Sequence, residues 1–486
     1  MTVMDGRFDL IVIGGGPAGV TAALRARELG ASVALVERNL FGGTCTNDGC
    51  VPVRVLAKAA RLLREARRFA QYGLASPPPV VHFSKVLERA QEVVYEMHEK
   101  KQMGEHLRES GVEVLEGVGE ARFLDSERIG LPDGRELAGH KFLICVGGRA
   151  RRLPLPGAEY ALLHTDVWNM KRLPASVAIV GSGATGAQLA TVFNAFGAEV
   201  TLVEVAPHLM PTADADVAAA LTAAFRQHGI EVLAGVEGVK AIERDQSGDT
   251  LVFTAGGQER RRLVEHVIFA TGWPGNSDTL NLAAAGVATK GAYIDVDDTL
   301  RTSVPHIYAA GDITGRLMLV QTANVQGRRA VENALLGQNQ SVHHRHIPYG
   351  GFTDPEYAGI GLTEAQARQI ADCLVAMVPY GDLDRAVIDG TTVGFAKLIV
   401  DRASRRVLGA HVVGEQAVEV VQILAPVMAG DLLIEQLAEI EFAYPTVAAI
   451  IGLAARQLAR ELDLVTMAPS WREQLGANVA EWERQA

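Results

Sequence analysis

Cysteine is scarce in this chain, with four residues among 486, and long apolar runs are missing. So few cysteines exclude the disulfide framework of a small secreted protein, and in a reducing compartment a pair serves catalysis, binds metal or stays free. No apolar run approaches the ~18 residues that span a bilayer. The start MTVMDGRFDL also lacks a basic region followed by an apolar core. We therefore expect a cytoplasmic protein with no membrane partner.

An excess of positive charge is missing as well. Lys and Arg number 46 against 57 Asp and Glu, and this formal net charge of -11 argues against a nucleic-acid partner and favours work on small molecules. Hydrophobic residues make up 48% of the chain and glycines number 50, as in a folded protein with many turns. The length indicates roughly three domains.

What the chain does contain is a pattern that occurs twice, at residues 8–38 and 176–204. Each copy reads as an apolar strand, a glycine turn, an Ala-rich helix and a second strand that ends on an acid, Glu37 or Glu204. The turn glycines are Gly14, Gly16 and Gly19 in the first copy and Gly181, Gly183 and Gly186 in the second. Such glycines allow a tight turn, let backbone N–H groups approach a pyrophosphate, and let helix and strand pack closely. Glycines that only pack a βαβ unit are the alternative, but the two acids favour two dinucleotide-binding sites.

Three further segments end short apolar strands in glycine. They are 141–157, 265–276 with Gly272, and 302–315 with Gly311 and Asp312. The first two close the two dinucleotide-binding units. A carboxylate such as Asp312 at the end of a strand can accept hydrogen bonds from a polyol, although an ordinary turn Asp is the simpler interpretation of this residue alone. Two dinucleotide sites indicate electron transfer between two cofactors, and these segments favour a flavin as one of them.

The stretch GGTCTNDGC (42–50) places Cys45 and Cys50 five positions apart. Along a regular helix this spacing is ~7.5 Å, whereas bridged cysteines need Cα atoms within ~6.8 Å of each other. A disulfide therefore needs a distorted turn, which Asn47-Asp48-Gly49 can supply, and distorted, accessible disulfides are the labile kind. A metal site needs further ligands, and no His or Cys lies near the pair in sequence, so we expect no metal.

The chain resembles the pyridine nucleotide-disulfide oxidoreductases, the group of dihydrolipoyl dehydrogenase, glutathione reductase and mercuric reductase, over residues 8 to about 462. The matching pieces are GGGPAG, GGTCTNDGCVP, GSGATG, ATGWPGN, YAAGD, TDPEYAGIGLTE, GFAKLIVD and LGAHVVG. The resemblance implies an α/β fold with two Rossmann-like dinucleotide-binding domains, a C-terminal α/β dimerisation domain, and a homodimer. The implied boundaries are 1–150 and 275–345 for the FAD domain, 151–274 for the NAD(P)H domain, 346–465 for the interface domain and 466–486 for a tail.

The same resemblance implies a role for each cysteine. Cys45 and Cys50 form a redox-active disulfide, in which Cys50 faces the flavin as a charge-transfer thiolate and Cys45 exchanges electrons with the substrate. A thiolate needs a positive local field, because an unperturbed thiol of pKa ~8.5 is mostly protonated at neutral pH. The helix that follows the motif supplies N–H groups, and Arg54 adds charge. Cys145 and Cys373 are expected to be core or surface thiols.

The cofactors implied are FAD and NADH. Glu37 would bind the adenosine ribose of FAD and Asp312 its ribityl chain. Other expected cofactor-binding residues, besides the turn glycines, are Gly43, Thr44, Arg54, Gln188, Gly272 and Gly311. Glu204 can accept hydrogen bonds from a ribose 2′-OH and would repel a 2′-phosphate, and no Lys or Arg lies between it and Arg226. We therefore expect NADH over NADPH.

Several positions depart from the family pattern. FAYPTVAA (442–449) stands where the family carries a pattern resembling HxHPTxxE, so Tyr444 replaces the catalytic His and Ala449 the Glu. A phenol of pKa ~10 is a poor general base near neutral pH, so Tyr444 either donates a hydrogen bond or packs the interface. In addition Arg54 replaces a Lys, Gln188 a Glu and Ala184 a bulky aromatic residue, which removes an ion pair and opens the flavin face.

These observations predict an FAD-dependent NAD(P)H oxidoreductase with a Cys45–Cys50 redox disulfide and an unidentified acceptor, which is a quinone, a metal ion or a small disulfide. Dihydrolipoyl dehydrogenase or mercuric reductase activity is one alternative. The tail 463–486 lacks the cysteine pair that passes Hg(II) inward in mercuric reductases, and soft-metal delivery needs thiolates. An alternative of another class is a flavin redox sensor or binding module with slow turnover.

Overall fold

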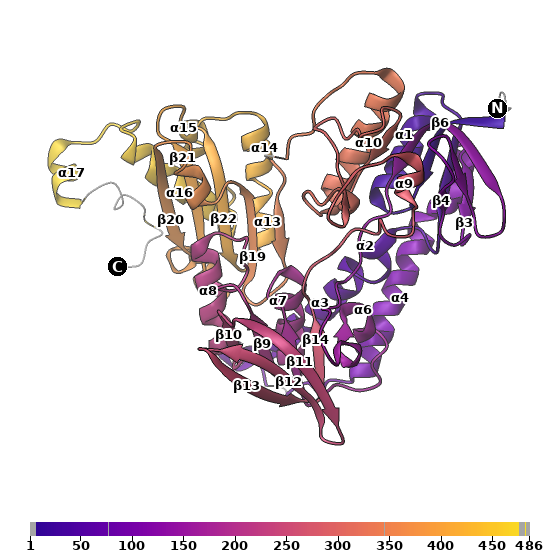
Figure 1. Ribbon diagram of the computed structural model, residues 1–486. Helices are drawn as coiled ribbons and strands as arrows, with labels where there is room; N and C mark the ends of the chain where they lie inside the picture. Colours follow the sequence, from indigo (N-terminus) through magenta and orange to yellow (C-terminus); the bar gives the residue numbers. More distant parts are fainter. Residues whose placement is uncertain (1–5, 76, 345, 476–481, 483–486) are drawn as a thin grey trace.

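The computed structural model describes residues 6–75, 77–344, 346–475 and 482. It is an α/β structure in which three large sheets carry their own helices, and Figure 1 shows them as three lobes. Two of the sheets contain the repeated glycine-turn units, and the third lies toward the C-terminal end. The α/β fold class expected from the sequence is confirmed.

The first sheet has the strand order β3-β2-β1-β6-β5-β4, with β17 beside β6. Its strands are β1 (Arg7–Ile13), β2 (Val33–Glu37), β3 (Glu113–Glu116), β4 (Arg122–Phe123), β5 (Arg128–Gly130), β6 (Glu136–Ile144) and β17 (Ile307–Ala309). The strands β3, β2, β1, β6 and β17 run parallel. The last four residues of β1 are buried, as expected of a central parallel strand that is covered on both faces. The segment 302–315 thus joins this sheet from far along the chain.

The second sheet is parallel throughout, in the order β10-β9-β8-β14-β7. Its strands are β7 (Leu162–Leu163), β8 (Ser176–Val180), β9 (Glu199–Glu204), β10 (Glu231–Ala234) and β14 (His266–Phe269). Between β10 and β14 the chain forms an antiparallel sheet of β11 (Gly238–Asp245), β12 (Gly248–Ala255) and β13 (Gln258–Val264). A short pair, β15 (Thr289–Lys290) and β16 (Tyr293–Ile294), precedes β17.

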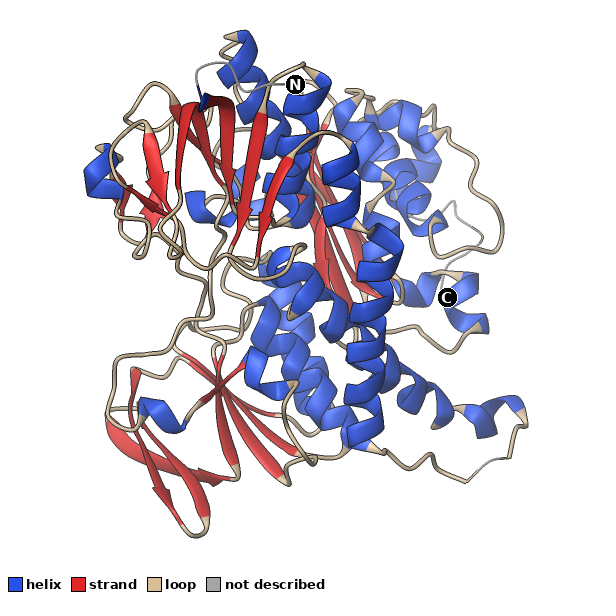
Figure 2. Cartoon of the chain, turned by 90° about the vertical axis from the view of Figure 1, so that its right-hand side faces the viewer, coloured by secondary structure: helices blue, strands red, loops and turns tan. Residues whose placement is uncertain are grey.

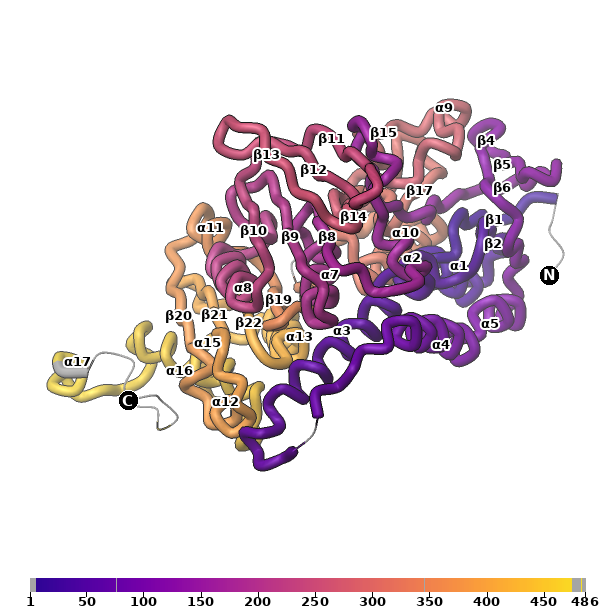
Figure 3. The backbone as a smooth tube through the Cα atoms, turned by 90° about the horizontal axis from the view of Figure 1, so that it is seen from below, coloured from indigo at the N-terminus to yellow at the C-terminus, as the bar shows by residue number. Residues whose placement is uncertain are grey.

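The two lobes also contain helices. They are α1 (Pro17–Glu28), α2 (Gly43–Asn47), α3 (Cys50–Ala66), α4 (Phe83–Lys101), α5 (Met103–Glu109), α6 (His164–Val167), α7 (Ala184–Phe196), α8 (Ala215–Gln227), α9 (Leu282–Ala285) and α10 (Val320–Leu336). The helices α3 and α4 lie side by side, and α3 also packs on α7 of the second unit (Figure 3). Leu56 of α3, Leu87 of α4 and Phe193 of α7 are buried in one apolar cluster. The helix that begins at Cys50 is therefore packed against the second unit.

The third sheet is antiparallel, in the order β18-β19-β22-β21-β20. Its strands are β18 (Tyr349–Gly351), β19 (Glu356–Gly361), β20 (Cys373–Pro379), β21 (Phe395–Asp401) and β22 (Val407–Gly414). Its helices are α11 (Glu364–Ala367), α12 (Asp384–Ile388), α13 (Ala417–Val421), α14 (Leu424–Ala429), α15 (Ile434–Ala438) and α16 (Ala449–Glu461). In Figure 2 this sheet is seen behind a row of helices. The tail contains α17 (Pro469–Leu475), and most of its remainder lies outside the described residues.

A buried cluster of charges connects the third sheet to the second unit. The ammonium of Lys397, 1% exposed, lies 2.9 Å from Asp214, 2.6 Å from Asp216 and 2.6 Å from Glu364. Asp214 is the N-cap of α8, where its carboxylate also accepts from the backbone N–H of Asp216. Because an unpaired charge is costly to bury, this cluster couples the two lobes strongly. Among the described residues, no helix combines the length and the apolar character needed to cross a membrane.

Candidate active site

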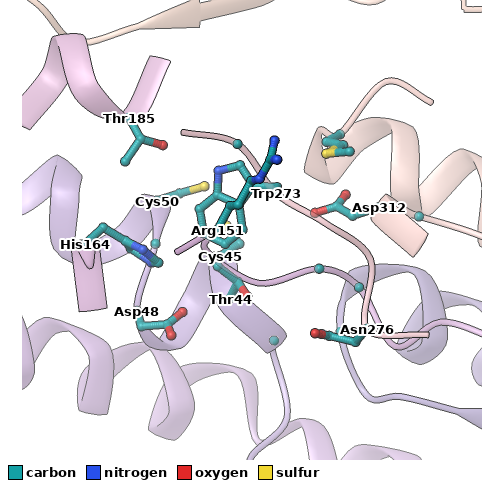
Figure 4. A pocket seen from close by; sticks show the side chains of 18 of the residues that line it. Thr44, Cys45, Asp48, Cys50, Arg151, His164, Thr185, Trp273, Asn276 and Asp312 are labelled. Carbon is teal, nitrogen blue, oxygen red and sulfur yellow. The ribbon is translucent and has the colours of Figure 1, made fainter. Parts of the chain in front are cut away.

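One large cavity, of about 1230 Å³, contains most of the residues predicted from the motifs. Its wall includes the glycine turns of both dinucleotide-binding units, Glu37, Glu204 and both cysteines of the CxxxxC motif. Figure 4 shows Cys45 and Cys50 between His164 and Asp48 on one side and Asn276 and Asp312 on the other. The fold therefore brings two nucleotide cradles and the cysteine pair to one space.

The cradle of the first unit is shaped by glycine. Gly14 has φ +105°, and a Cβ there would collide with the carbonyl of Cys145. A Cβ at Gly19 would collide with the carbonyl of Gly14, so the third glycine is what allows α1 to pack on β1. Gly16 is the N-cap of α1, and no side chain caps this helix end. Its free N–H groups and positive dipole end fit the pyrophosphate of a dinucleotide.

The second cradle has the same features. Gly181 has φ +98°, and a Cβ there would collide with the carbonyl of Ala270. A Cβ at Gly186 would collide with the carbonyl of Gly181. Gly183 is the N-cap of α7, again with no side-chain cap, and so this helix end also fits a pyrophosphate.

The acids at the ends of the second strands are buried and held by the backbone. Glu37 accepts hydrogen bonds from the N–H groups of Gly15 at 2.6 Å and Asn39 at 2.8 Å. Glu204 accepts from the N–H of Ser182 at 2.8 Å, from its hydroxyl at 2.7 Å, and from the N–H of Ala206 at 2.9 Å. A carboxylate offers about four lone-pair sites, so each acid can still accept from a ribose hydroxyl.

Asp312 differs from these two acids. It follows Gly311 at the end of β17, and burial raises the pKa of its carboxyl. No group of the described chain donates a hydrogen bond to its side chain, although the carboxylate faces the cavity. A partly buried carboxylate without a partner is costly, and the hydroxyls of a polyol such as a ribityl chain would satisfy it. Gly43, Thr44, Gly272 and Gly311 line the same cavity.

The two cysteines lie on either side of a break between helices. α2 ends at Asn47 and α3 begins at Cys50, so the chain does not continue as a regular helix from one cysteine to the other. A Cβ at Gly49 would lie 2.8 Å from the carbonyl oxygen of Thr44, which explains a glycine at this bend. The indole of Trp168 donates to the carbonyl of Asp48 at 2.9 Å and fixes the bend to the second unit.

The thiols of Cys45 and Cys50 are present as free cysteines and interact with each other. The hydrogen bond from the Cys45 thiol lowers the pKa of Cys50 to about 7, helped by the N–H of Cys50 at the start of α3. The same interaction, together with burial, raises the pKa of Cys45, which Lys101 partly opposes. In the reduced pair Cys50 is therefore the sulfur that ionises first, near neutral pH, while Cys45 stays a thiol.

Arg54 and Gln188, both expected to bind a cofactor, lie in different surroundings. Arg54 does not line the main cavity. Its guanidinium lies 3.6 Å from the ring centroid of Phe352 and 3.9 Å from Glu356, facing a second cavity of about 460 Å³. Gln188 does line the main cavity and accepts from the N–H of Phe352 at 3.2 Å. The cation that acts on the cysteines is instead Lys101 of α4, which opposes the rise in the pKa of Cys45 and which no motif indicated.

Tyr444 lies away from the cavity of its own chain. It is 58% exposed, donates its hydroxyl to Asp384 at 2.7 Å, and its ring lies 5.4 Å from that of Trp482. Ala449 is the first residue of α16. Cys145 and Cys373 are both buried, and burial raises the pKa of Cys145. The site also includes residues that the sequence did not single out as site residues, namely Asp48, Arg151, His164, Trp273 and Asn276.

Comparison with known proteins explains this combination of two cradles and a cysteine pair. The model of the family described as pyridine nucleotide-disulphide oxidoreductase matches residues 8–327, and that of its dimerisation domain matches residues 347–455. The chain belongs to this family. Membership makes it an oxidoreductase that uses FAD and a pyridine nucleotide, and the dimerisation domain supports a homodimer.

Relatives with several different names resemble the chain along most of its length. Mercuric reductase of Staphylococcus aureus is 32% identical over 455 residues, 93% of this chain and 82% of the relative. Dihydrolipoyl dehydrogenase of Zymomonas mobilis is 34% identical over 427 residues, 86% of this chain and 91% of the relative. Among solved structures, LpdA of Mycobacterium tuberculosis has a TM-score of 0.83 at 28% identity, covering 92% of this chain and 99% of that one.

A further solved structure is the HOCl-induced flavoprotein disulfide reductase RclA of Escherichia coli. It has a TM-score of 0.80 at 27% identity and covers 92% of this chain and 99% of its own. The same protein in complex with Cu(II) has a TM-score of 0.81. Relatives within this one family carry different names, so membership of the family does not identify the electron acceptor of this chain.

Proposed function

We propose that this protein passes two electrons from NADH, through FAD, to a Cys45–Cys50 disulfide and on to a small acceptor. The observation that carries the proposal is the cavity itself, which joins both nucleotide cradles to the interacting thiols of Cys45 and Cys50. FAD, when bound, would accept a hydride from the nicotinamide and pass the two electrons to the disulfide. The residues of the chain bind and orient the cofactors and set the protonation of the two cysteines.

We assign each cofactor-binding residue to FAD or to the nicotinamide cofactor according to the dinucleotide-binding unit in which it lies. We place FAD on the Gly14–Gly19 turn with Glu37 at its ribose and Asp312 at its polyol chain. We place the nicotinamide cofactor on the Gly181–Gly186 turn, with Glu204 at its ribose. Trp168 and the shared core of α3 and α7 fix the second unit against the cysteine bend. These contacts hold the two nucleotide sites in a fixed position relative to each other.

The preference for NADH is supported by the charges around Glu204. The acid is 7% exposed, lines the cavity, and is oriented by Ser182 and Ala206. The segment from residue 205 to 225 contains no Lys or Arg. His208, the cation-forming side chain in that segment, pairs its Nδ1 with the carbonyl of Leu209 at 3.0 Å. A 2′-phosphate would meet a buried negative charge there with little to offset it.

Within the pair we assign different roles to the two sulfurs. Cys50, whose pKa is lowered, is the thiolate that faces the flavin, and Cys45, whose pKa is raised, carries the proton and exchanges with the acceptor. A disulfide acceptor leaves a thiolate that must be protonated, and neither Tyr444 nor Ala449 can shuttle a proton near neutral pH. We therefore place a quinone or a metal ion ahead of lipoamide or glutathione disulfide.

A metal ion as acceptor has specific support from two relatives, since one is named mercuric reductase and the other is described in complex with Cu(II). The described residues contain no group of three or more His, Cys, Asp or Glu side chains arranged to hold a metal ion. A metal ion would therefore meet the protein at the cysteine pair as a substrate. The second candidate function, a redox sensor with slow turnover, is favoured by the missing His and Glu alone.

Steady-state oxidation of NADH with a panel of acceptors tests the proposal. The panel contains lipoamide, glutathione disulfide, quinones, Cu(II), Hg(II) and oxygen, each with wild type and Cys45→Ser. We expect turnover with a quinone or a metal ion that Cys45→Ser reduces strongly. Rapid flavin reduction by NADH with negligible turnover on every acceptor would instead support the sensor.

A further inference from the structure

A second cavity, of about 460 Å³, has no use in the function proposed so far. It lies where α3 and the end of α7 meet the third lobe, and its wall is rich in arginine. The arginines of the wall are Arg54, Arg61, Arg64, Arg67 and Arg68. Its carboxylates are Asp354, Glu356 and Glu415. Even without His228, the wall therefore carries two more positive than negative charges.

All five arginines come from one stretch of chain, which runs from the cysteine bend toward the third lobe (Figure 3). Arg61 and Arg64 follow Arg54 by seven and ten residues, so these three lie on the same side of α3. Arg67 is the C-cap of that helix, and Arg68 follows it. A helix dipole favours cations in the last turn only, so it does not account for Arg54 and Arg61. The cluster therefore needs another explanation.

The three carboxylates of the wall are already paired. The pairs are Asp354 with Arg64 at 2.7 Å, Glu415 with Arg61, and Glu356 with Arg61 at 3.6 Å and with Arg54 at 3.9 Å. The side chain of Arg67 forms no ion pair or hydrogen bond with the described residues, and Arg68 donates to the carbonyl of Gly390 at 3.2 Å. The two positive charges without a carboxylate partner are therefore neighbours in sequence at the end of α3.

Like charges held together in a partly buried site are unfavourable. Burial lowers the pKa of the Arg64 guanidinium, Asp354 raises it, and the charges of Arg61 and Arg67 lower it further. An anion in the cavity would offset this repulsion, because an opposite charge nearby favours the charged form of a guanidinium.

The paired arginines are held in place without using all their donors. Arg64 contacts Asp354 through its Nε, and the guanidinium of Arg54 lies 3.6 Å from the ring centroid of Phe352. A guanidinium carries five N–H donors in a planar fork that matches the oxygens of phosphate and carboxylate groups. A ligand with such oxygens would therefore meet donors that are already positioned, which lowers the entropy lost on binding.

We propose that the second cavity is a binding site for a small oxyanion with at least two negative charges, as carried by a phosphate ester or a polycarboxylate. Two charges match the excess of arginine over carboxylate in the wall. Arg67 and Arg68 supply the two uncompensated charges, and Arg64 adds a donor group that Asp354 holds in place. Binding involves no covalent or redox step, so the site is independent of the cysteine pair and of the proposed function.

Isothermal titration calorimetry of the FAD-loaded full-length protein tests this site, with pyrophosphate and citrate as probes. Wild type should bind at least one of them. The double change Arg67→Gln with Arg68→Gln should weaken that binding by about tenfold or more, because it removes two charge-assisted contacts. The probe that wild type binds more tightly identifies the ligand as a phosphate ester or as a polycarboxylate.

The matched control is Arg89→Gln with Arg261→Gln, which removes the same charge from two exposed arginines elsewhere. It should leave probe binding unchanged, because both side chains lie outside the second cavity. Three results overturn the proposal: no binding of either probe by wild type, binding that the changes at Arg67 and Arg68 leave intact, or equal weakening by the control.

A titration with NAD⁺ present distinguishes this site from the two nucleotide cradles, whose helix ends can also bind phosphate. Among the described residues that line the main cavity, none is one of the five arginines of the second. With FAD bound and NAD⁺ saturating, the probe should therefore still bind. Loss of probe binding when NAD⁺ is added contradicts the proposal.

A measurement on wild type alone keeps the proposal testable if the double variant fails to bind FAD. Phenylglyoxal reacts with accessible arginines, and mass mapping of peptides locates the modified residues. The bound probe should slow the modification of Arg67, which is exposed, and of Arg68, but not that of Arg261. Equal rates at Arg67 and Arg68 with and without the probe contradict the proposal.

Discussion

The two dinucleotide-binding units share their turns down to individual hydrogen bonds, but differ in the segment that follows the second strand. Gly14 donates to the carbonyl of Val36 at 2.8 Å, and Gly181 donates to that of Val203 at the same distance. In the first unit the segment after the second strand returns to the glycine turn, where the N–H of Gly42 donates to the carbonyl of Gly15 at 2.9 Å. This segment then continues into the cysteine bend. The chain thereby places its cysteine pair beside the first cradle.

The equivalent segment of the second unit takes a structural role. It leads to Asp214, the N-cap of α8, which pairs with the buried ammonium of Lys397 in the third sheet at 2.9 Å. Where the first unit needs Gly15 to admit the ring of Phe41, the second has Ser182, whose hydroxyl is bonded to Glu204. The same βαβ framework thus carries the cysteine bend after its second strand in one copy and a fixed connection to the third lobe in the other.

The largest effect is expected when the third glycine of each turn is changed. In Gly19→Ala the new Cβ collides with a backbone carbonyl and separates α1 from β1, so the purified protein should contain almost no flavin. Gly186→Ala makes the same collision in the second unit and should keep its flavin while KM for NADH rises at least about tenfold, a loss of ~1.4 kcal/mol in binding. Flavin absorbance and NADH kinetics measure both. Equal flavin loss in the two variants would contradict the separate roles of the units.

The next largest effect concerns the charged connection of the second unit. Lys397→Met leaves Asp214 buried without its main cation, which typically costs about 3–5 kcal/mol. Thermal unfolding should show this loss, whereas Lys240→Met, at an exposed pair with Glu259, should change stability little. Burial acts to raise the pKa of Asp214, but hydrogen bonds from the N–H of Glu364 and the ammonium of Lys397 hold it below its usual value. The contribution of this carboxylate is therefore present above its unfolded pKa and declines as the pH falls through its folded pKa.

A smaller effect is expected for the nucleotide preference. Glu204→Arg removes the buried negative charge beside the second cradle and adds a cation, so the ratio of kcat/KM for NADH over NADPH should fall by roughly tenfold or more, about 1.4 kcal/mol. Glu204→Gln, which keeps one acceptor oxygen, should change the ratio less. A wild type that prefers NADPH would show that Glu204 does not select the cofactor.

The smallest effect concerns the third lobe. Tyr444→His combined with Ala449→Glu restores the acid–base pair of the family, and positioned general acid–base catalysis is typically worth ~10²–10⁴ in rate. Because neighbouring residues have adapted to Tyr444, which donates to Asp384, we expect a gain in lipoamide turnover of about tenfold. Strong lipoamide reduction by wild type, unchanged in Tyr444→Phe, would show that another group supplies the proton.

The sequence indicated those parts of the site that depend on local spacing. The turn glycines and the acids at the strand ends form contacts within one βαβ unit, so their pattern predicts their position. The Cys45–Cys50 spacing similarly required a bend, which the structure has at Gly49. The α/β fold and the family followed from these motifs together.

The sequence did not indicate the residues that reach the site from elsewhere in the fold. Lys101 and His164 reach the cysteine bend only because α4 and α6 pack against it. Arg54, selected from its place after the motif, instead faces Phe352 and Glu356. These positions depend on how separate helices and strands pack together, and a short sequence motif does not contain that information.

Anaerobic titration with dithionite tests directly whether Cys45 and Cys50 store electrons beside the flavin. Wild type should take up about twice as many electrons per flavin as Cys50→Ser, because the disulfide accepts two in addition to the two of FAD. At the half-way point it should show a long-wavelength thiolate absorbance that grows as the pH rises through about 7, the pKa of Cys50, since the thiolate is the form present above that pH. Equal electron uptake by the two proteins, with no such absorbance in wild type, would contradict the claim.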